Sequence, residues 1–123
     1  LGTVRGSSIS MEKIVEQGML YDFYGELLTP HQRKIYEDVV FNDMSLSEIA
    51  EEQGISRQGV HDLVKRCDKT LAEYESKLKL VEKFHQTRRM VEEIRQLTGE
   101  YQKNQDMKLI QKIQQIAGEI IEL

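Results

Sequence analysis

The sequence predicts an all-α protein, in which a helix-turn-helix is followed by a long C-terminal helical extension. Three observations predict this fold class. Apolar residues recur at the three- and four-residue spacing of amphipathic helices through most of the 123 residues. Proline occurs once, so long stretches can stay helical. Two pairs typical of helix capping boxes, Thr29 with Gln32 and Ser45 with Glu48, indicate where helices begin.

Two helices are expected before the motif. The first spans residues 11–28, where an apolar stripe follows helical spacing. The second begins at Pro30, which fits the first helical position, with Thr29 as its N-cap, and runs to about Phe41. The aromatic residues of the first stripe could stack on bases, but an amphipathic core helix explains their spacing better. The first stripe is Leu20, Phe23, Tyr24, Leu27 and Leu28, and the second is Ile35, Tyr36, Val39 and Val40.

Residues 45–69, SLSEIAEEQGISRQGVHDLVKRCDK, are the stretch around which the rest of the chain is organised. They indicate two helices that meet at a tight turn, because Gly54 can adopt a positive φ and Ala50 is small where the helices pass closest. Ser56 is expected to cap the second helix. Gln53 departs from the pattern, since an apolar residue is expected just before the glycine. The predicted motif core is Ile49, Ala50, Gly54, Ile55, Val60 and Leu63.

The second motif helix would present polar side chains to nucleic acid. With Val60 facing inward, a rotation of about 100° per residue places a basic and amide-bearing face outward. The N-terminal part of such a helix meets base edges, so Arg57 and Gln58 would read bases, and the basic residues farther along would hold phosphates. Asp62 would repel phosphate unless it accepts from cytosine or pairs with Lys65 or Arg66. The candidate nucleic-acid-binding residues are Ser56, Arg57, Gln58, His61, Lys65, Arg66 and Lys69; solvated positions without a binding role are the alternative.

Two stretches of this region resemble a known family. Residues 21–32, YDFYGELLTPHQ, and residues 45–66, SLSEIAEEQGISRQGVHDLVKR, are similar to the YlxM/p13-like family of small bacterial proteins, which is related to the promoter-reading fourth domain of sigma factors. The first stretch is the more family-specific, because the second recurs across sigma-like regulators. The resemblance covers about half the chain. It implies a sigma-factor domain 4-like helical bundle with a regulatory role in the signal recognition particle pathway, where the particle's GTPase or RNA would be the partner.

Beyond Cys67 two apolar lines indicate a helix that changes neighbours along its length. No breaker occurs before Gly99, so the second motif helix could run on, with a joint near residues 68–70. The first line would pack on the N-terminal domain and the second on another helix. Residues 99–106 are polar and predict a turn before a last helix over residues 106–123. The first line is Cys67, Leu71, Tyr74, Leu78 and Val81; the second is Leu80, Phe84, Thr87, Val91, Ile94, Thr98 and Tyr101.

The last helix carries a broad isoleucine face that another surface must cover. Burying each isoleucine is worth about 1.5–3 kcal/mol, so leaving the face in water would be costly. Residues 91–101 would cover part of it in an antiparallel hairpin. We expect a second subunit to cover the rest, which makes the protein a homodimer; a helix lying on a membrane is the rival, but the polar face lacks an excess of Lys and Arg. The expected dimer face is Ile110, Ile113, Ile116 and Ile120.

Composition predicts a soluble, cytoplasmic protein of two parts. Residues 1–10, LGTVRGSSIS, are expected to be a remnant of expression, residues 11–70 the helix-turn-helix domain, and residues 71–123 the extension. Apolar residues make up 39% of the chain, and no run approaches the roughly 20 that a membrane span needs. The net charge of −4 argues against nucleic-acid binding by bulk electrostatics, although residues 56–70 are locally basic. Cys67 is expected to be a buried thiol.

No catalytic or metal-binding pattern is present in the sequence. His31, His61 and His85 are far apart and have no cysteine or carboxylate at metal-ligand spacing. Glycine-rich phosphate loops and nucleophile motifs are also missing. We therefore expect a protein that is not an enzyme and needs no cofactor or metal. Two functions stay open: a regulator in the signal recognition particle pathway that acts through protein or RNA contacts, and a sequence-specific DNA-binding transcription regulator.

Overall fold

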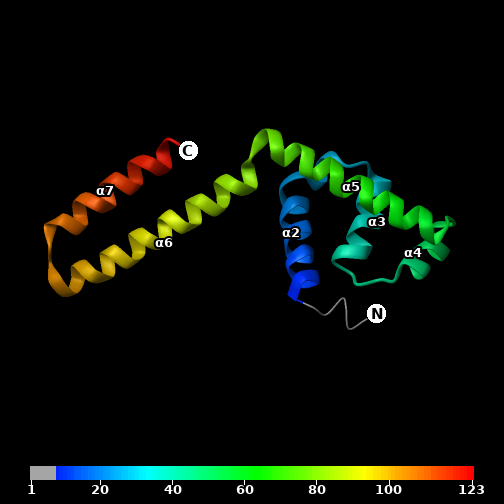
Figure 1. Ribbon diagram of the computed structural model, residues 1–123, viewed down its shortest axis with the longest axis horizontal. Coiled ribbons are helices and arrows are strands. Elements are labelled where there is room, and N and C mark those ends of the chain that lie inside the picture. Colours follow the sequence, from blue (N-terminus) through cyan, green and yellow to red (C-terminus); the bar gives the residue numbers. More distant parts are fainter. Residues whose placement is uncertain (1–7) are drawn as a thin grey trace. The chain divides into compact units, whose positions relative to one another are not determined.

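The computed structural model describes residues 8–123, which contain six α-helices, one short 3-10 helix and no strand (Figure 1). The predicted all-α class is confirmed. The chain divides into two compact units, one that ends at Lys79 and one that spans Leu80–Leu123. Within the described part, no helix is both long and apolar enough to cross a membrane.

The N-terminal unit, whose described part is residues 8–79, is a bundle around one long helix. Helix α5 packs against each of α2, α3 and α4. Residues 8–10, part of the segment expected to be an expression remnant, form the first turn of α2, and the rest of that segment lies outside the described residues. The elements of the unit are α2 (Ser8–Tyr24), the 3-10 helix η1 (Gly25–Leu27), α3 (Pro30–Val40), α4 (Leu46–Gln53) and α5 (Arg57–Leu78).

Helix α3 begins at the capping box that the sequence predicted. The Thr29 hydroxyl accepts from the Gln32 N–H at 3.2 Å, and the Gln32 side chain accepts from the Thr29 N–H at 3.0 Å. At the other end, the buried Asp38 holds the link to the motif, because its Oδ1 accepts from Asn42 Nδ2 at 2.8 Å and its carbonyl accepts from the Met44 N–H at 3.0 Å. The path from α3 into α4 is therefore held by both the side chain and the backbone carbonyl of one residue.

The predicted stripe of the first helix is only partly buried. Tyr24 and Leu28 are buried, but Phe23 and Leu27 are 37% and 55% exposed. The α-helix ends at Tyr24 and gives way to η1, so the expected 100° spacing does not continue to residue 28. The Tyr24 hydroxyl donates to Glu75 Oε1 at 2.5 Å on α5, and its ring stacks on Tyr74. Tyr24 is therefore a core residue and is not available to stack on a base.

A second polar contact fixes α5 against both α2 and α3. Asp68 of α5 accepts from the Tyr36 hydroxyl at 2.5 Å and from Gln17 Nε2 at 3.0 and 3.1 Å. Tyr36 is fully buried, and this burial together with its bond to Asp68 raises the pKa of the Tyr36 hydroxyl. Buried polar groups are stable only when they are paired in this way. The contact therefore sets the rotation of α5 about its axis, and with it the face that α5 presents outward.

The inward face of α5 follows the predicted apolar line as far as Tyr74, whereas Leu78 is 49% exposed and Val81 lies beyond the end of α5, in the second unit. Val60, Leu63, Cys67 and Leu71 are buried, and Tyr74 reaches the ring of Tyr24. The thiol of Cys67 is buried as expected. Burial raises its pKa to about 11, so it stays protonated and unreactive near neutral pH.

The second unit is an antiparallel helical hairpin, and its boundaries differ from those expected. Helix α5 continues through residues 68–70, where a joint was predicted, because Asp68 and Leu71 are anchored in the N-terminal unit. The break falls at Lys79, which has a left-handed φ of 56°. No glycine or proline at this position marks the break in the sequence. The turn predicted over residues 99–106 is shorter, since α6 (Leu80–Asn104) runs through Gly99. Only Gln105, with a φ of 54°, and Asp106, the N-cap of α7 (Met107–Ile121), separate the helices.

Helices α6 and α7 lie side by side and form the C-terminal hairpin (Figure 1). The hairpin has its own small core. The predicted packing of the last helix on the preceding one is therefore confirmed. The inward line of α6 differs from the predicted second line: Leu97 and Met90 take the places expected for Thr98 and Val91, and Val91 is 52% exposed. The buried residues are Leu97, Leu109 and Ile116, and the residues packed against them are Met90, Ile94, Tyr101, Ile113 and Ile120.

Candidate nucleic-acid interface

The first helix of the motif and its turn follow from local sequence chemistry. Ser45 and Glu48 form a reciprocal capping box with bonds of 3.1 and 3.0 Å, which also lowers the pKa of the Glu48 carboxyl. Helix α4 ends at Gly54, whose φ of 68° and ψ of 32° lie in the left-handed region. The next N–H, that of Ile55, donates to the Ala50 carbonyl at 3.1 Å. These bonds close the turn and point the chain into α5.

The start of the recognition helix, α5, is held by Ser56. Its hydroxyl accepts from the Gly59 N–H at 2.9 Å, and its carbonyl accepts from the Val60 N–H at 3.1 Å. The motif core that the sequence predicted lies between the two helices, with Gly54 outside it at the exposed turn and Ile55 half-buried. Gln53, the departure from the apolar pattern, is also half-buried. The buried members are Ile49, Ala50, Val60 and Leu63.

All seven candidate nucleic-acid-binding residues are exposed and lie on one helix or its cap. Arg57 stands at the N-terminal tip of α5, and the lysines and Arg66 follow along its outward surface. The hydroxyl of Ser56 is used inside the motif, so its contribution to binding would be limited to positioning the helix start. The exposed residues are Ser56, Arg57, Gln58, His61, Lys65, Arg66 and Lys69.

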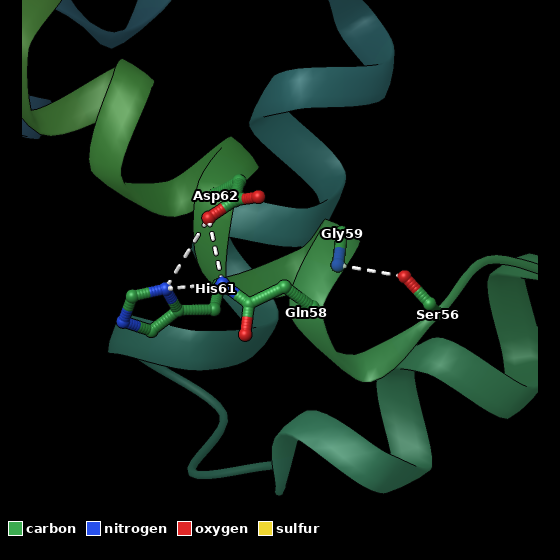
Figure 2. A network of polar contacts seen from close by, with 5 residues as sticks. All are labelled: Ser56, Gln58, Gly59, His61 and Asp62. Carbon is green, nitrogen blue, oxygen red and sulfur yellow. Dashed lines mark hydrogen bonds and ion pairs between the residues drawn. The ribbon is translucent and has the colours of Figure 1, made fainter.

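Three side chains near the start of α5 form a polar cluster (Figure 2). Gln58 donates from Nε2 to Asp62 Oδ1 at 2.9 Å. The His61 Nδ1 atom lies 3.5 Å from both Gln58 Nε2 and Asp62 Oδ1. Gln58 and His61 lower the pKa of the Asp62 carboxyl, with the Gln58 bond as the larger cause. Asp62 is therefore an anion at neutral pH, in the middle of the candidate interface.

This cluster changes the role expected for two residues. The sequence left Asp62 to accept from cytosine or to pair with Lys65 or Arg66, but its hydrogen-bond partner is Gln58. One N–H of the Gln58 amide is thereby used, and its second N–H and its oxygen stay available. Asp62 therefore orients the Gln58 amide. Its oxygen can accept a hydrogen bond from an exocyclic amine of adenine or cytosine.

Lys13 is a basic residue beside the recognition helix that the sequence did not predict as part of the site. A hollow between α2 and α5 is lined by Lys13 together with His61, Lys65 and Asp68. Lys13 precedes Lys65 by about half the chain, so no local pattern could join them. A neighbouring hollow also contains Glu12 and Glu16, so the charge on this flank is mixed. A third hollow, lined by Leu46, Arg57, Gln58 and His61, lies at the N-terminal part of α5.

The described residues contain no group of three or more His, Cys, Asp or Glu side chains that could hold a metal ion. The arrangement offers hydrogen-bond donors, acceptors and positive charge on a helix face, and these groups suit recognition of a ligand surface.

Comparison with known proteins bears on the same region. The model of the family described as "Putative helix-turn-helix protein, YlxM / p13 like" matches residues 11–116. Relatives named UPF0122 protein occur in Bacillus thuringiensis strain Al Hakam, Bacillus mycoides strain KBAB4 and Bacillus cereus strain AH187. Each is 43% identical over 101 residues, which cover 81% of this chain and 92% of the relative. The match thus includes both units and most of the last helix.

Proposed function

The chain belongs to the UPF0122 family of YlxM/p13-like helix-turn-helix proteins, and we propose that it is a non-enzymatic cytoplasmic regulator that binds nucleic acid through the N-terminal half of α5. The observation that carries this proposal is the geometry of the motif. Gly54 turns the chain so that α5 starts at an exposed tip with Arg57 and Gln58, while Val60 and Leu63 face inward. That arrangement exposes the part of the helix that enters a major groove in proteins of this class.

Each exposed side chain then has a chemical role. Arg57 donates two hydrogen bonds to a guanine, and Gln58 accepts from a base amine while Asp62 holds its amide nitrogen. Lys65, Arg66 and Lys69 bind phosphates along the groove. The negative charge of Asp62 lowers the attraction of this helix face for phosphates in general, so base contacts by Arg57 and Gln58 account for a larger share of the binding.

The charge of the protein limits its affinity. With a net charge of −4, the chain gains little from bulk attraction to DNA. Three cationic side chains on phosphates correspond to a slope of roughly −3 in a plot of log affinity against log salt concentration. Binding should therefore be modest at physiological salt and stronger below it.

Alanine substitutions separate base contacts from phosphate contacts. Arg57→Ala should weaken binding to a preferred duplex by about 1–3 kcal/mol and relax specificity at one base pair. Lys69→Ala should weaken all sequences alike and reduce the salt slope by about one. Gel shifts over a salt series measure both, with Lys103→Ala in the C-terminal hairpin as the matched lysine control. Equal losses on every sequence for Arg57→Ala would contradict a role in base reading.

A role in the signal recognition particle pathway is the second proposal. The acidic balance of the chain, with Asp62 on the outward face of the recognition helix, suits contacts to a protein better than bulk binding to a nucleic acid. The partner would be the particle's GTPase or its RNA. Purification from native cells distinguishes the proposals, since the first is supported by a bound DNA fragment and the second by the GTPase or the particle RNA.

A further inference from the structure

The C-terminal hairpin has two long sides of opposite chemical character. In an antiparallel pair of helices, the residue that follows each inward residue lies on one side of the hairpin, and the residue that precedes it lies on the other. The contacts agree with this geometry: Gln86, Arg89 and Glu93 of α6 line a common hollow with Leu123, which follows α7. The two preceding sides of the helices therefore face the same way.

The preceding side is polar. Every residue that directly precedes an inward residue of the hairpin core is charged or carries a side-chain amide. It would be well solvated as it stands. Its members are Arg89, Glu93, Gln96 and Glu100 on α6, and Lys108, Lys112, Gln115 and Glu119 on α7.

The following side, which we name the apolar side, is mostly uncharged and leaves aliphatic residues in water. Val91 is 52% exposed and Ile121 is 82% exposed. Its one charged member, Arg95, has a guanidinium 4.0 Å from the carboxylate of Glu92. The apolar side consists of Val91, Arg95, Thr98 and Gln102 on α6, and Ile110, Gln114, Ala117 and Ile121 on α7.

The hairpin core is small. Leu97, Leu109 and Ile116 are its buried residues, and each keeps 7–9% of its surface exposed. Two helices with so few buried side chains gain little stability from packing, because small domains bury little apolar area to offset the entropy of ordering the chain. Another apolar surface packed against the hairpin would therefore add to its stability.

We propose that the apolar side packs against the same side of a second copy of this chain, so that two hairpins form a four-helix bundle. Helices of such bundles carry apolar residues on the core line and on one flanking line. Helix α7 has this pattern through Ile110, Ala117 and Ile121, and α6 adds Val91 beside it. A twofold interface brings the same patch of both copies together. A surface with almost no charge can pack on its own copy without repulsion between like charges. An anionic membrane would instead call for several Lys or Arg beside the apolar residues, whereas this side has Arg95 alone.

The size of the surface sets the strength of the dimer. A 15-residue helix is about 22 Å long, and two helices side by side are about 20 Å wide, so a flat face covers roughly 450 Å² per copy. The pair would bury about 900 Å² if both faces are treated as flat, which is below the roughly 1,200–2,000 Å² of stable interfaces and within the range of weak ones. We therefore expect a dissociation constant in the micromolar range.

This interface differs from the one expected from the sequence. Ile113, Ile116 and Ile120 lie in the hairpin core, so they stabilise each copy, and only Ile110 of the expected dimer face lies on the apolar side. The interface is rotated by about one residue, or 100°, around α7.

Sedimentation of the full chain tests the proposal. The wild-type protein should be a dimer at tens of micromolar. Ala117→Lys with Ile121→Lys should weaken the dimer by at least ~100-fold without loss of helicity, because both side chains are exposed within one copy. The control Gln96→Lys with Gln115→Lys adds the same charge to the polar side and should stay dimeric. A wild-type monomer at 200 µM, or equal behaviour of the two double variants, would overturn the proposal; neither result bears on nucleic-acid binding by α5.

Discussion

Gly54→Val is expected to lower the melting temperature of the N-terminal unit by roughly 5–20 °C, which corresponds to about 1–3 kcal/mol of strain. Gly54 has a φ of 68°, where a β-branched side chain meets its own backbone. A Cβ at this position would meet no other atom within 4 Å. The loss therefore comes from backbone strain alone, and circular dichroism during heating measures it.

Two controls separate strain from side-chain size. Gly54→Asn should lose much less than Gly54→Val, because asparagine tolerates the left-handed region. Gly99→Ala, inside α6 with open space around it, should be neutral or stabilising. An unchanged melting temperature for Gly54→Val would show that residue 54 does not hold a left-handed turn in solution.

Leu97→Asp is expected to unfold the C-terminal hairpin while the N-terminal unit stays folded. Leu97 is one of three buried residues of the hairpin core, and its replacement removes apolar burial and places a charge there. The combined cost exceeds about 3 kcal/mol, which is more than so small a core can absorb. Hydrogen exchange should show rapid exchange over residues 80–123 and continued protection in α5, because the two units are separately compact.

The neighbouring residue provides the matched control. Gln96→Asp introduces the same charge one position earlier, on the exposed polar side of α6, and should leave the hairpin protected. If Leu97→Asp also removed protection from the N-terminal unit, the two units would depend on each other for stability.

Features encoded by a few adjacent residues could be predicted from the sequence. The two capping boxes, the left-handed Gly54 and the Ser56 cap are local, since each depends on groups within four residues of one another. The burial pattern of α5 from Val60 to Leu71 could also be predicted, because a regular helix repeats its inward face every three to four residues. The exposure of the seven candidate residues follows from the same periodicity.

Features that depend on distant contacts could not be predicted. Asp68 meets Tyr36 and Gln17 across 32 and 51 residues, and Lys13 reaches the flank of α5 from another helix. The break at Lys79 carries no glycine or proline, so no local pattern marked it. The hydrogen-bond donor to Asp62 lies within about one helical turn, but several neighbouring side chains could donate to it. The structure identifies Gln58 as the donor.

Selection of binding sites from a random pool of duplex DNA tests whether the N-terminal half of α5 reads bases. The full chain should be used at low salt, where its modest electrostatic attraction is strongest. We expect an enriched sequence that contains a guanine whose preference disappears in Arg57→Ala, while Lys69→Ala enriches the same sequence with weaker retention. Recovery of no enriched sequence by the wild-type protein would contradict base reading by the N-terminal half of α5.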